Sequence, residues 1–279
     1  MKMSFANQQA PLVVDVIKET TVRKCIAAMR NGEYAGAMGH DLHISCIEES
    51  ERTEEKLRSI IEASRRPVLA LNYNGTAEGT YFTTTEEERI ALLERAARAG
   101  ASAVDMQAYS FDLPTKEAFL DKEYVTEDML FAKTNPCEVA LKPEIVNKQK
   151  EFIRRMHENG TEVLLSCHPR VSMNCAQVVS LAKELASRGP DIVKIVTMCE
   201  NEEQLAEAFK TMLVLKKEIT DCKIHFHCSG PCGKLTRIVN PMLGAYLVFC
   251  NERFTQASDF EQVQLKAMAD TLRLLDWRM

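Results

Sequence analysis

Strand-like and helix-like runs alternate along almost the whole chain, and this alternation constrains the fold more than any single motif. The apolar, β-branched runs predicted to be strands are Leu12–Val16, Met38–Ile47, Val68–Asn74, Ala103–Tyr109, Glu162–His168, Asp191–Met198, Lys223–Cys228 and Tyr246–Asn251. The amphipathic runs predicted to be helices are Thr21–Met29, Glu54–Ala63, Glu86–Ala99, Pro143–Glu158, Cys175–Arg188, Glu202–Lys217, Gly233–Leu243 and about Phe260–Trp277. Strands and helices in strict alternation predict a closed (β/α)8 barrel, the TIM barrel.

An open, doubly wound sheet is the competing α/β fold. Such a sheet usually carries a glycine-rich turn after its first strand, and none follows Val16. We therefore expect a single barrel domain that spans residues 1–279.

One segment breaks the alternation. Ser110–Val139 separates the fourth and fifth predicted strands, contains Pro114 and Pro136, and is too long for an ordinary connecting loop. We expect an insertion at about 110–139, with a short helix near Lys116–Leu120. Long insertions of this kind are often lids or binding elements.

Composition and charge limit the classes of partner. Hydrophobic residues make up 46% of the 279 residues and charged residues 27%, so a sizeable core is expected. The net charge of −5 disfavours binding to nucleic acid, and no apolar stretch approaches the length that spans a membrane. The start of the chain, Met1 to Asn7, lacks a signal-peptide pattern, so we expect a cytoplasmic protein that binds neither nucleic acid nor membrane.

The ten cysteines are scattered, and several lie within apolar runs, as Cys167 and Cys250 do. Without a secretory signal, buried free thiols are expected rather than disulfides. Cys228 and Cys232 have no second pair of ligands to complete a zinc site, and we expect no metal there.

Lys194 lies inside a β-branched apolar run, where a charged side chain is unfavourable. A buried lysine tends to lose its charge, and a neutral amine is a nucleophile that forms a Schiff base with a ketone. The structural alternative is an edge strand from which the lysine side chain reaches water.

Histidines mark two other strands. His168 ends the fifth predicted strand directly before a proline, and in a barrel it would lie beside Lys194 on the next strand, at the edge where catalysis occurs. It is either an acid–base group or a structural histidine. His225 and His227 share one face of the seventh strand, which leaves open a metal-dependent hydrolase that uses both as ligands.

Several short motifs together resemble type I 3-dehydroquinate dehydratase. Ser166-Cys167-His168 is similar to the S-x-H that ends strand five of that family, and Asp191–Val196 resembles the strand that carries its imine-forming lysine. The other similar segments are Ala77-Glu78-Gly79, Gly233-Lys234-Leu235-Thr236-Arg237 for G-x-x-S-R, and Ala257-Ser258-Asp259-Phe260-Glu261-Gln262 for the final-loop A-S-A-P-G-Q. No single motif is specific, but their joint order along the chain is.

The resemblance implies a lyase that converts 3-dehydroquinate to 3-dehydroshikimate in the shikimate pathway of aromatic amino acid biosynthesis. Lys194 would form the imine, His168 would act as the general base and then as the general acid, and Glu78 would orient the imidazole. Arg237 would hold the carboxylate of this small keto-carboxylate substrate, and Ser258 and Gln262 would close over it. The resemblance implies no cofactor and no metal, and it favours a homodimer.

Some substrate-binding positions depart from the family pattern. Ile44 and Cys46 replace an acid and an arginine at the end of the second strand, and Asn74 replaces an arginine at the end of the third. These changes leave two alternatives open. One is a divergent dehydratase, which could recruit Arg170, Arg253 or a residue of the Ser110–Val139 insertion. The other is a Schiff-base lyase or aldolase for a different carboxylated ketone.

Overall fold

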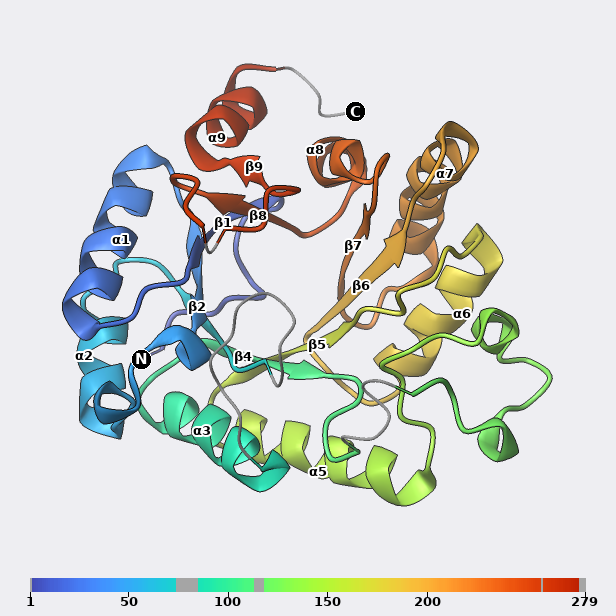
Figure 1. Cartoon of the computed structure of the whole chain (residues 1–279), viewed down its shortest axis with the longest axis horizontal. Coiled ribbons are helices and arrows are strands. Elements are labelled where there is room, and N and C mark those ends of the chain that lie inside the picture. Colours follow the sequence, from blue (N-terminus) through green and yellow to red (C-terminus); the bar gives the residue numbers. More distant parts are fainter. Residues whose placement is uncertain (1, 74–84, 113–117, 257, 276–279) are drawn as a thin grey trace. The chain divides into compact units, whose positions relative to one another are not determined.

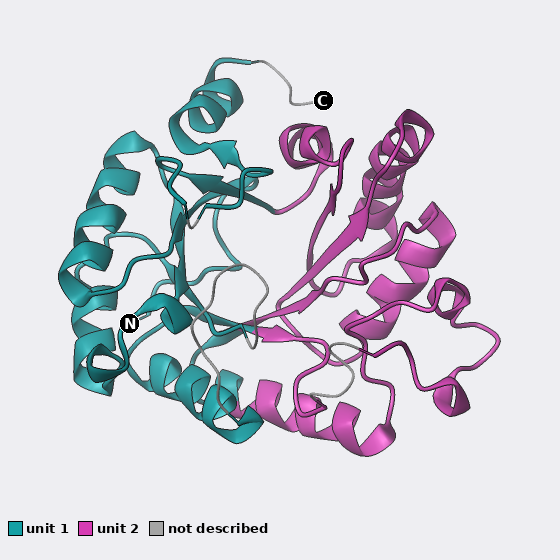
Figure 2. Cartoon of the chain, in the orientation of Figure 1, with its two compact units in different colours: residues 1–105, 156–162, 247–279 teal, residues 106–155, 163–246 magenta. Residues whose placement is uncertain are grey.

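The computed structural model describes residues 2–73, 85–112, 118–256 and 258–275, and the chain forms two compact units (Figure 2). Unit 1 contains residues 1–105, 156–162 and 247–279, and unit 2 contains residues 106–155 and 163–246. The chain passes between the units after residues 105, 155, 162 and 246, so both units use segments that are distant in sequence. The expectation of a single domain stays a prediction.

Unit 1 is built on parallel strands in the order β4–β3–β2–β1–β8–β9. The strands are β1 (Leu12–Ile17), β2 (Gly39–His43), β3 (Val68–Leu71), β4 (Ala103–Gln107), β8 (Leu247–Asn251) and β9 (Val263–Gln264). The helices are α1 (Val22–Ala35), α2 (Glu54–Glu62), α3 (Glu86–Arg98) and α9 (Leu265–Leu274) (Figure 1). Thr21, Thr53 and Thr85 cap the first three helices by accepting backbone N–H groups.

Unit 2 is built on the parallel strands β5 (Glu162–Cys167), β6 (Ile192–Met198) and β7 (Lys223–Ser229), with β6 in the middle. Its helices are α5 (Pro143–Glu158), α6 (Cys175–Ala186), α7 (Glu202–Glu218) and α8 (Lys234–Leu243). Contacts of α6 with β6, and of α7 and α8 with β7, cover one face of the sheet. The other face carries the polar side chains that form the candidate site.

All eight predicted strands are present, but their ends differ from the prediction. β2 stops at His43, because Ile44–Cys46 turn into a short 3-10 helix, so the predicted strand to Ile47 is too long. The last helix begins at Leu265 instead of Phe260, because Val263 and Gln264 first pair with β8. None of the helices in the described part of the chain is both long and apolar enough to cross a membrane.

The insertion between β4 and α5 lies against α6. The backbone N–H of Leu130 donates to the Ser180 hydroxyl (3.0 Å), which in turn donates to the Asp128 carbonyl (3.3 Å). The expected helix near Lys116–Leu120 lies partly outside the described residues, and in the described part Phe119 instead forms an antiparallel bridge with Cys137.

Arg188 anchors both ends of this insertion. Its buried guanidinium donates to the Gln149 side chain (2.5 Å), the Ala140 carbonyl (2.9 Å) and the Glu184 carboxylate (3.1 Å). Gln149 in turn donates to the Ala108 carbonyl (3.0 Å), next to the end of β4. A buried arginine with several acceptors fixes backbone geometry, because each acceptor left alone would be an unsatisfied polar group.

In unit 1, Asp15 is a buried carboxyl group on β1. Its Oδ1 accepts the backbone N–H of Glu252 (3.1 Å), and its Oδ2 has no hydrogen-bond partner among the described residues. Gly32 of α1 approaches so closely that a Cβ there would lie 2.1 Å from Oδ2. Burial raises the pKa of Asp15 to about 7, against the lowering effect of the hydrogen bond from Glu252.

This raised pKa predicts how stability depends on pH. Between about pH 4 and 7 the native state holds a proton on Asp15 that the unfolded chain has released, so the free energy of unfolding falls as pH rises. The free energy of unfolding of Asp15→Asn should not fall in this way. Relative to that of the native chain, it should increase by about 4 kcal/mol between about pH 4 and 7. Urea denaturation at several pH values measures the difference.

Asp270→Asn is the matched control. Hydrogen bonds from Lys266 (2.8 Å) and Arg273 (3.1 Å) hold the pKa of exposed Asp270 below 3.8, so this carboxyl group does not titrate in the window. A stability difference for Asp15→Asn that stays constant with pH would contradict the account.

Candidate active site

Lys194 lies on the central strand of unit 2. The ladder pairs it with Ser166 on β5 and with His225 on β7, and its side chain is buried, with 8% exposed. The edge-strand alternative is therefore wrong, because both edges of β6 are paired. Side chains alternate along a strand, so Lys194 and Val196 share the face that carries Ser166, His225 and His227.

His168 follows β5 directly and is fixed by an unforeseen partner. Its Nδ1 lies 3.2 Å from Oε2 of Glu138, and its backbone N–H donates to the same oxygen (3.3 Å). The Glu138 carboxylate is almost fully buried (1% exposed), and its other oxygen accepts from Arg170 Nη2 (3.1 Å). A carboxylate in this position sets the tautomer and the orientation of an imidazole.

Glu138 comes from the end of the insertion and was missed from the sequence. Its φ of +63° and the φ of +59° at Arg170 lie in the left-handed region, which is uncommon and strained for residues other than glycine. The surrounding contacts hold this backbone: Cys137 N–H donates to the Pro169 carbonyl (2.9 Å), and the Cys167 thiol donates to the Glu138 carbonyl (3.5 Å). The only sequence signal was an acidic residue beside the apolar run Val139–Leu141.

The sequence analysis assigned the same orienting role to Glu78. Glu78 lies outside the described residues, so that assignment remains a prediction. Within the described chain, Glu138 holds the position beside His168.

Arg237 lies in the first turn of α8 and is mostly buried. Its Nη2 donates to the Ser229 hydroxyl at the end of β7 (3.2 Å). The adjacent Thr236 hydroxyl accepts the Cys228 N–H (2.8 Å) and donates to the Gly233 carbonyl (2.6 Å), which ties the helix start to the strand. Arg237 is thereby held at the carboxyl end of β7, as expected for a residue that grips an anionic group.

His225 and His227 form a buried pair on the same face as Lys194. Nε2 of His225 lies 2.8 Å from Nδ1 of His227, and the ring centroids are 4.9 Å apart. The metal-hydrolase alternative required both rings to bind an ion, but here they bind each other. No group of three potential ligands of the types His, Cys, Asp and Glu is gathered at one point in the part of the chain that the structure describes.

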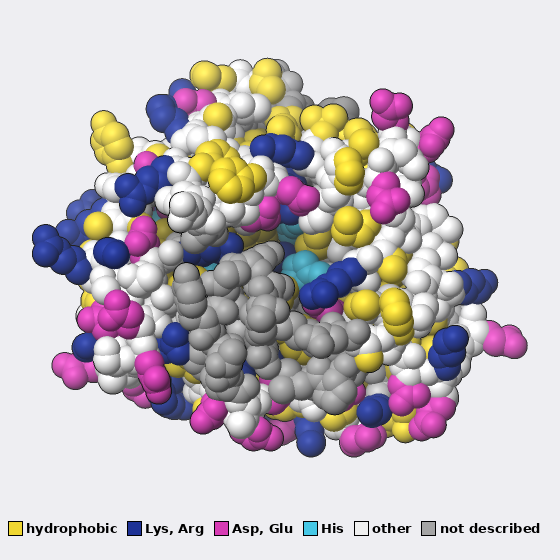
Figure 3. All heavy atoms as spheres, viewed as in Figure 1, with side chains coloured by type: hydrophobic (Ala, Val, Ile, Leu, Met, Phe, Trp, Pro, Cys, Tyr) yellow, Lys and Arg dark blue, Asp and Glu magenta, His cyan; other side chains and the backbone are white. Residues whose placement is uncertain are grey.

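The site of unit 2 is rich in basic groups. Burial lowers the pKa of His227 well below its usual value, and Arg237, His225, Lys194 and His168 lower it further in that order. Figure 3 shows histidine side chains reaching the viewed surface beside a basic side chain. Such a cluster suits a small anionic substrate.

Ser258 and Gln262 lie in the loop after β8, in unit 1. The Ser258 hydroxyl accepts the Thr255 N–H (2.9 Å), and Gln262 Oε1 is buried with no hydrogen-bond partner among the described residues. Their contact with a substrate remains a prediction. Of the departures from the family pattern, Ile44 and Cys46 are buried in the turn after β2, and Asn74 lies outside the described residues.

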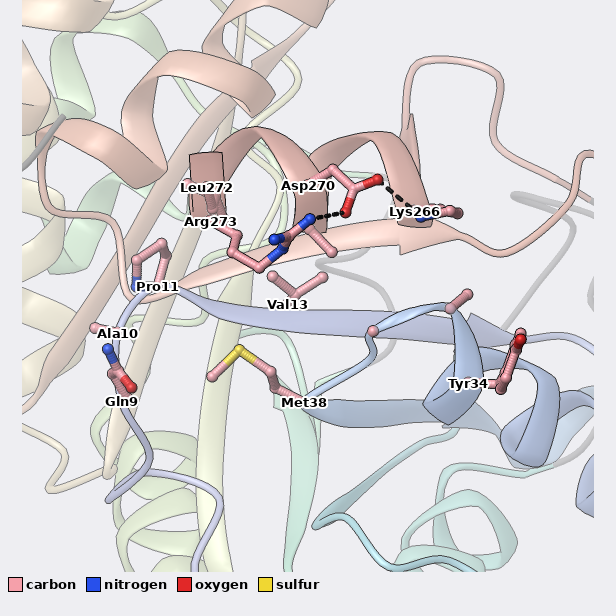
Figure 4. Close-up of a pocket in the computed structure, with 13 residues that line it drawn as sticks. Gln9, Ala10, Pro11, Val13, Tyr34, Met38, Lys266, Asp270, Leu272 and Arg273 are labelled. Atoms are coloured by element: carbon pink, nitrogen blue, oxygen red, sulfur yellow. Dashed lines mark hydrogen bonds and ion pairs between the residues drawn. The ribbon is translucent and has the colours of Figure 1, made fainter. Parts of the chain in front are cut away.

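A cavity of about 440 Å³ lies in unit 1 (Figure 4). Residues that line it include Pro11 before β1, Met38 before β2 and Leu272 of α9, and the ion-paired Lys266, Asp270 and Arg273 border it. It thus lies at the amino ends of the strands, whereas catalysis in α/β barrels occurs at the carboxyl ends.

Comparison with known proteins gives one consistent result. A family model described as type I 3-dehydroquinase matches residues 17–278. The 3-dehydroquinate dehydratase of Dehalococcoides mccartyi is 26% identical over 243 residues, which cover 87% of this chain and 88% of the relative. The enzyme of Desulfotalea psychrophila is 23% identical over 195 residues, which cover 69% and 70% of the two chains.

Solved structures agree in fold. A type I 3-dehydroquinate dehydratase from Clostridium difficile with covalent modified comenic acid has a TM-score of 0.73 at 16% identity, with 98% of this chain and 97% of that chain covered. The enzyme from Geobacillus kaustophilus has a TM-score of 0.73 at 12% identity, with 99% and 98% covered. These likenesses confirm the predicted fold class.

The close approach at Gly233 gives a test of the turn that holds Arg237. A Cβ at Gly233 would lie 2.6 Å from the Cys228 carbonyl oxygen and 2.7 Å from Ser229 backbone atoms, although φ is an ordinary −70°. Gly233→Ala should therefore lower the free energy of unfolding by about 2 kcal/mol, because backbone must move. Leu235→Ala, at a position that is 44% exposed, should change it by less than about 1 kcal/mol. Equal stabilities of the two variants in urea denaturation would refute the steric argument.

Proposed function

The chain belongs to the type I 3-dehydroquinase family, and on this basis we propose that it dehydrates 3-dehydroquinate to 3-dehydroshikimate through a Schiff base on Lys194. The observation that best supports the assignment of Lys194 is its position in the sheet. Lys194 is a buried lysine on the middle strand of β5–β6–β7, on the face that carries Ser166 and the two histidines of β7.

The reaction begins with imine formation. The Lys194 amine attacks the C3 ketone of the substrate, a C–N bond forms, and the carbonyl oxygen leaves as water after taking up protons. The resulting iminium withdraws electrons from C2, so a proton on C2 becomes acidic.

His168 then acts first as the general base and next as the general acid, so that it carries one proton from C2 to the leaving hydroxyl group. It removes the C2 proton, and the electron pair forms the C1–C2 double bond as the C1 hydroxyl leaves. The same proton passes from the imidazolium to the departing hydroxyl, which becomes water. Glu138 accepts a hydrogen bond from the ring and stabilises the imidazolium, as a carboxylate does in other catalytic triads. Hydrolysis of the imine releases 3-dehydroshikimate.

Arg237 binds the substrate carboxylate. Its guanidinium is mostly buried and held by Ser229, whereas the other arginine near His168, Arg170, is already paired with Glu138. A guanidinium fork fits a carboxylate in a bidentate manner. Ser258 and Gln262 complete the binding of the substrate through the loop after β8, as the family resemblance implies.

The product is an intermediate of the shikimate pathway, so the proposed role is in aromatic amino acid biosynthesis. The family likeness also favours a homodimer in the cytoplasm.

A different carboxylated ketone is the second candidate substrate. Ile44 and Cys46 are apolar and buried at positions where the family pattern has an acid and an arginine. A lyase or aldolase that keeps Lys194 but has lost these charges would form the same imine with a less polar ketone.

Borohydride trapping tests the proposal. Incubation with 3-dehydroquinate and reduction should add a substrate-sized mass to Lys194, as found by peptide mass spectrometry, and Lys194→Ala should abolish both adduct and turnover. Lys223→Ala, an exposed lysine at the start of β7, is the matched control and should keep both. An adduct without turnover favours the second candidate, and turnover by Lys194→Ala refutes the mechanism.

Glu138 has its own test. Glu138→Gln should lower kcat by on the order of 10²-fold with little change in KM, because His168 loses its orientation while Lys194 and Arg237 stay in place. Borohydride should still trap the imine on Lys194. Glu144→Gln, an exposed acid on the first turn of α5, should leave kcat unchanged. A Glu138→Gln enzyme with native kcat would show that another group orients His168.

A further inference from the structure

The buried His225–His227 pair has no role in the reaction as described above, yet it lies beside the reacting amine. The ladder places His225 opposite Lys194 and His227 opposite Val196, two residues nearer the carboxyl end of the sheet. Two residues of strand correspond to roughly 6.6 Å. His227 thus lies toward the edge of the sheet at which His168 and Arg237 are also found.

The order of the strands fixes how a cyclic substrate must lie. Lys194 on β6 binds C3, and His168 at the end of β5 must face C2, since it removes the C2 proton. The other ring neighbour of C3 is C4, which carries a hydroxyl group in 3-dehydroquinate. Because β7 flanks β6 on the side opposite β5, C4 and its hydroxyl are directed toward β7.

His227 suits a neutral hydroxyl group rather than a carboxylate. Burial lowers the pKa of His227 well below its usual value, and the charges of Arg237, His225, Lys194 and His168 lower it further, so the ring is held in its neutral form. A neutral imidazole has one nitrogen that donates and one that accepts. The Nδ1 of His227 is engaged by His225, so the Nε2 is the nitrogen that can meet a ligand.

We propose that His227 is a substrate-binding residue whose Nε2 hydrogen-bonds the C4 hydroxyl of the substrate, while His225 fixes the tautomer of His227. This inference rests on the proposed function and adds to it. The contact from His227 would replace a polar contact of the kind that is lost with the charged residues at positions Ile44 and Cys46. It would favour cyclic keto acids that have a hydroxyl group beside the ketone.

Steady-state kinetics of the full chain tests the contact. His227→Leu should raise KM for 3-dehydroquinate about tenfold and leave kcat within about threefold, because one hydrogen bond to the bound substrate is lost. His227→Gln should restore KM to within about threefold, since its amide nitrogen can occupy the place of Nε2. With the 4-deoxy analogue of 3-dehydroquinate, the native enzyme and His227→Leu should have equal KM values.

The outcomes separate this inference from the function on which it rests. An unchanged KM in His227→Leu, or an equal rise for both ketones, overturns the contact while imine trapping on the native enzyme upholds the function. A native enzyme that neither traps nor turns over 3-dehydroquinate overturns both. If His227→Leu fails to fold, as thermal melting shows, the native enzyme decides: the contact requires a KM for the 4-deoxy analogue about tenfold above that for 3-dehydroquinate, and equal KM values overturn it. His40→Gln, at a buried histidine that faces Glu33 of α1, should leave both KM values unchanged.

Discussion

The parallel pairing of β6 with both β5 and β7 is the constraint on which the proposed site depends. A parallel ladder fixes register, and the register fixes which side chains meet: Ser166, Lys194 and His225 stand side by side on one face. A shift of the strand register by one residue would turn the Lys194 side chain toward the helices, and the proposed reaction could not take place on this face. The helices α6, α7 and α8 cover the other face and exclude that register, because it would bury charge among apolar side chains.

The loops that follow the strands supply the groups proposed to orient the side chains of the site. Glu138 reaches His168 from the insertion, and Arg188 holds both ends of that insertion through buried hydrogen bonds. The left-handed backbone at Glu138 and Arg170 costs free energy, and the contacts of the folded loop offset this cost. An insertion that looks like a surface excursion in the sequence therefore forms part of the proposed catalytic apparatus.

Electrostatics explains how one cluster can contain a nucleophile, an acid–base group and a binding group. Burial and neighbouring basic groups keep the His227 ring neutral, whereas Glu138 compensates the charges of Arg170 and the imidazolium that forms at His168. Arg237 is the residue proposed to bind the carboxylate of the substrate. The proposed roles of the basic side chains therefore depend on which of them lie beside the Glu138 carboxylate, not on how many charged groups are present.

The sequence by itself determined the alternation of strands and helices, the position of Lys194 within a strand, and the order of motifs that resemble the family. These are local signals, because the apolar period of two or 3.6 residues and the spacing of a motif are written in consecutive residues. Only the tertiary structure decided that Glu138 lies beside His168 and that the rings of His225 and His227 contact each other. Thirty residues separate Glu138 from His168, and no periodicity links them. Their contact exists because the loop folds back across the end of β5, which depends on packing that no short stretch of sequence encodes.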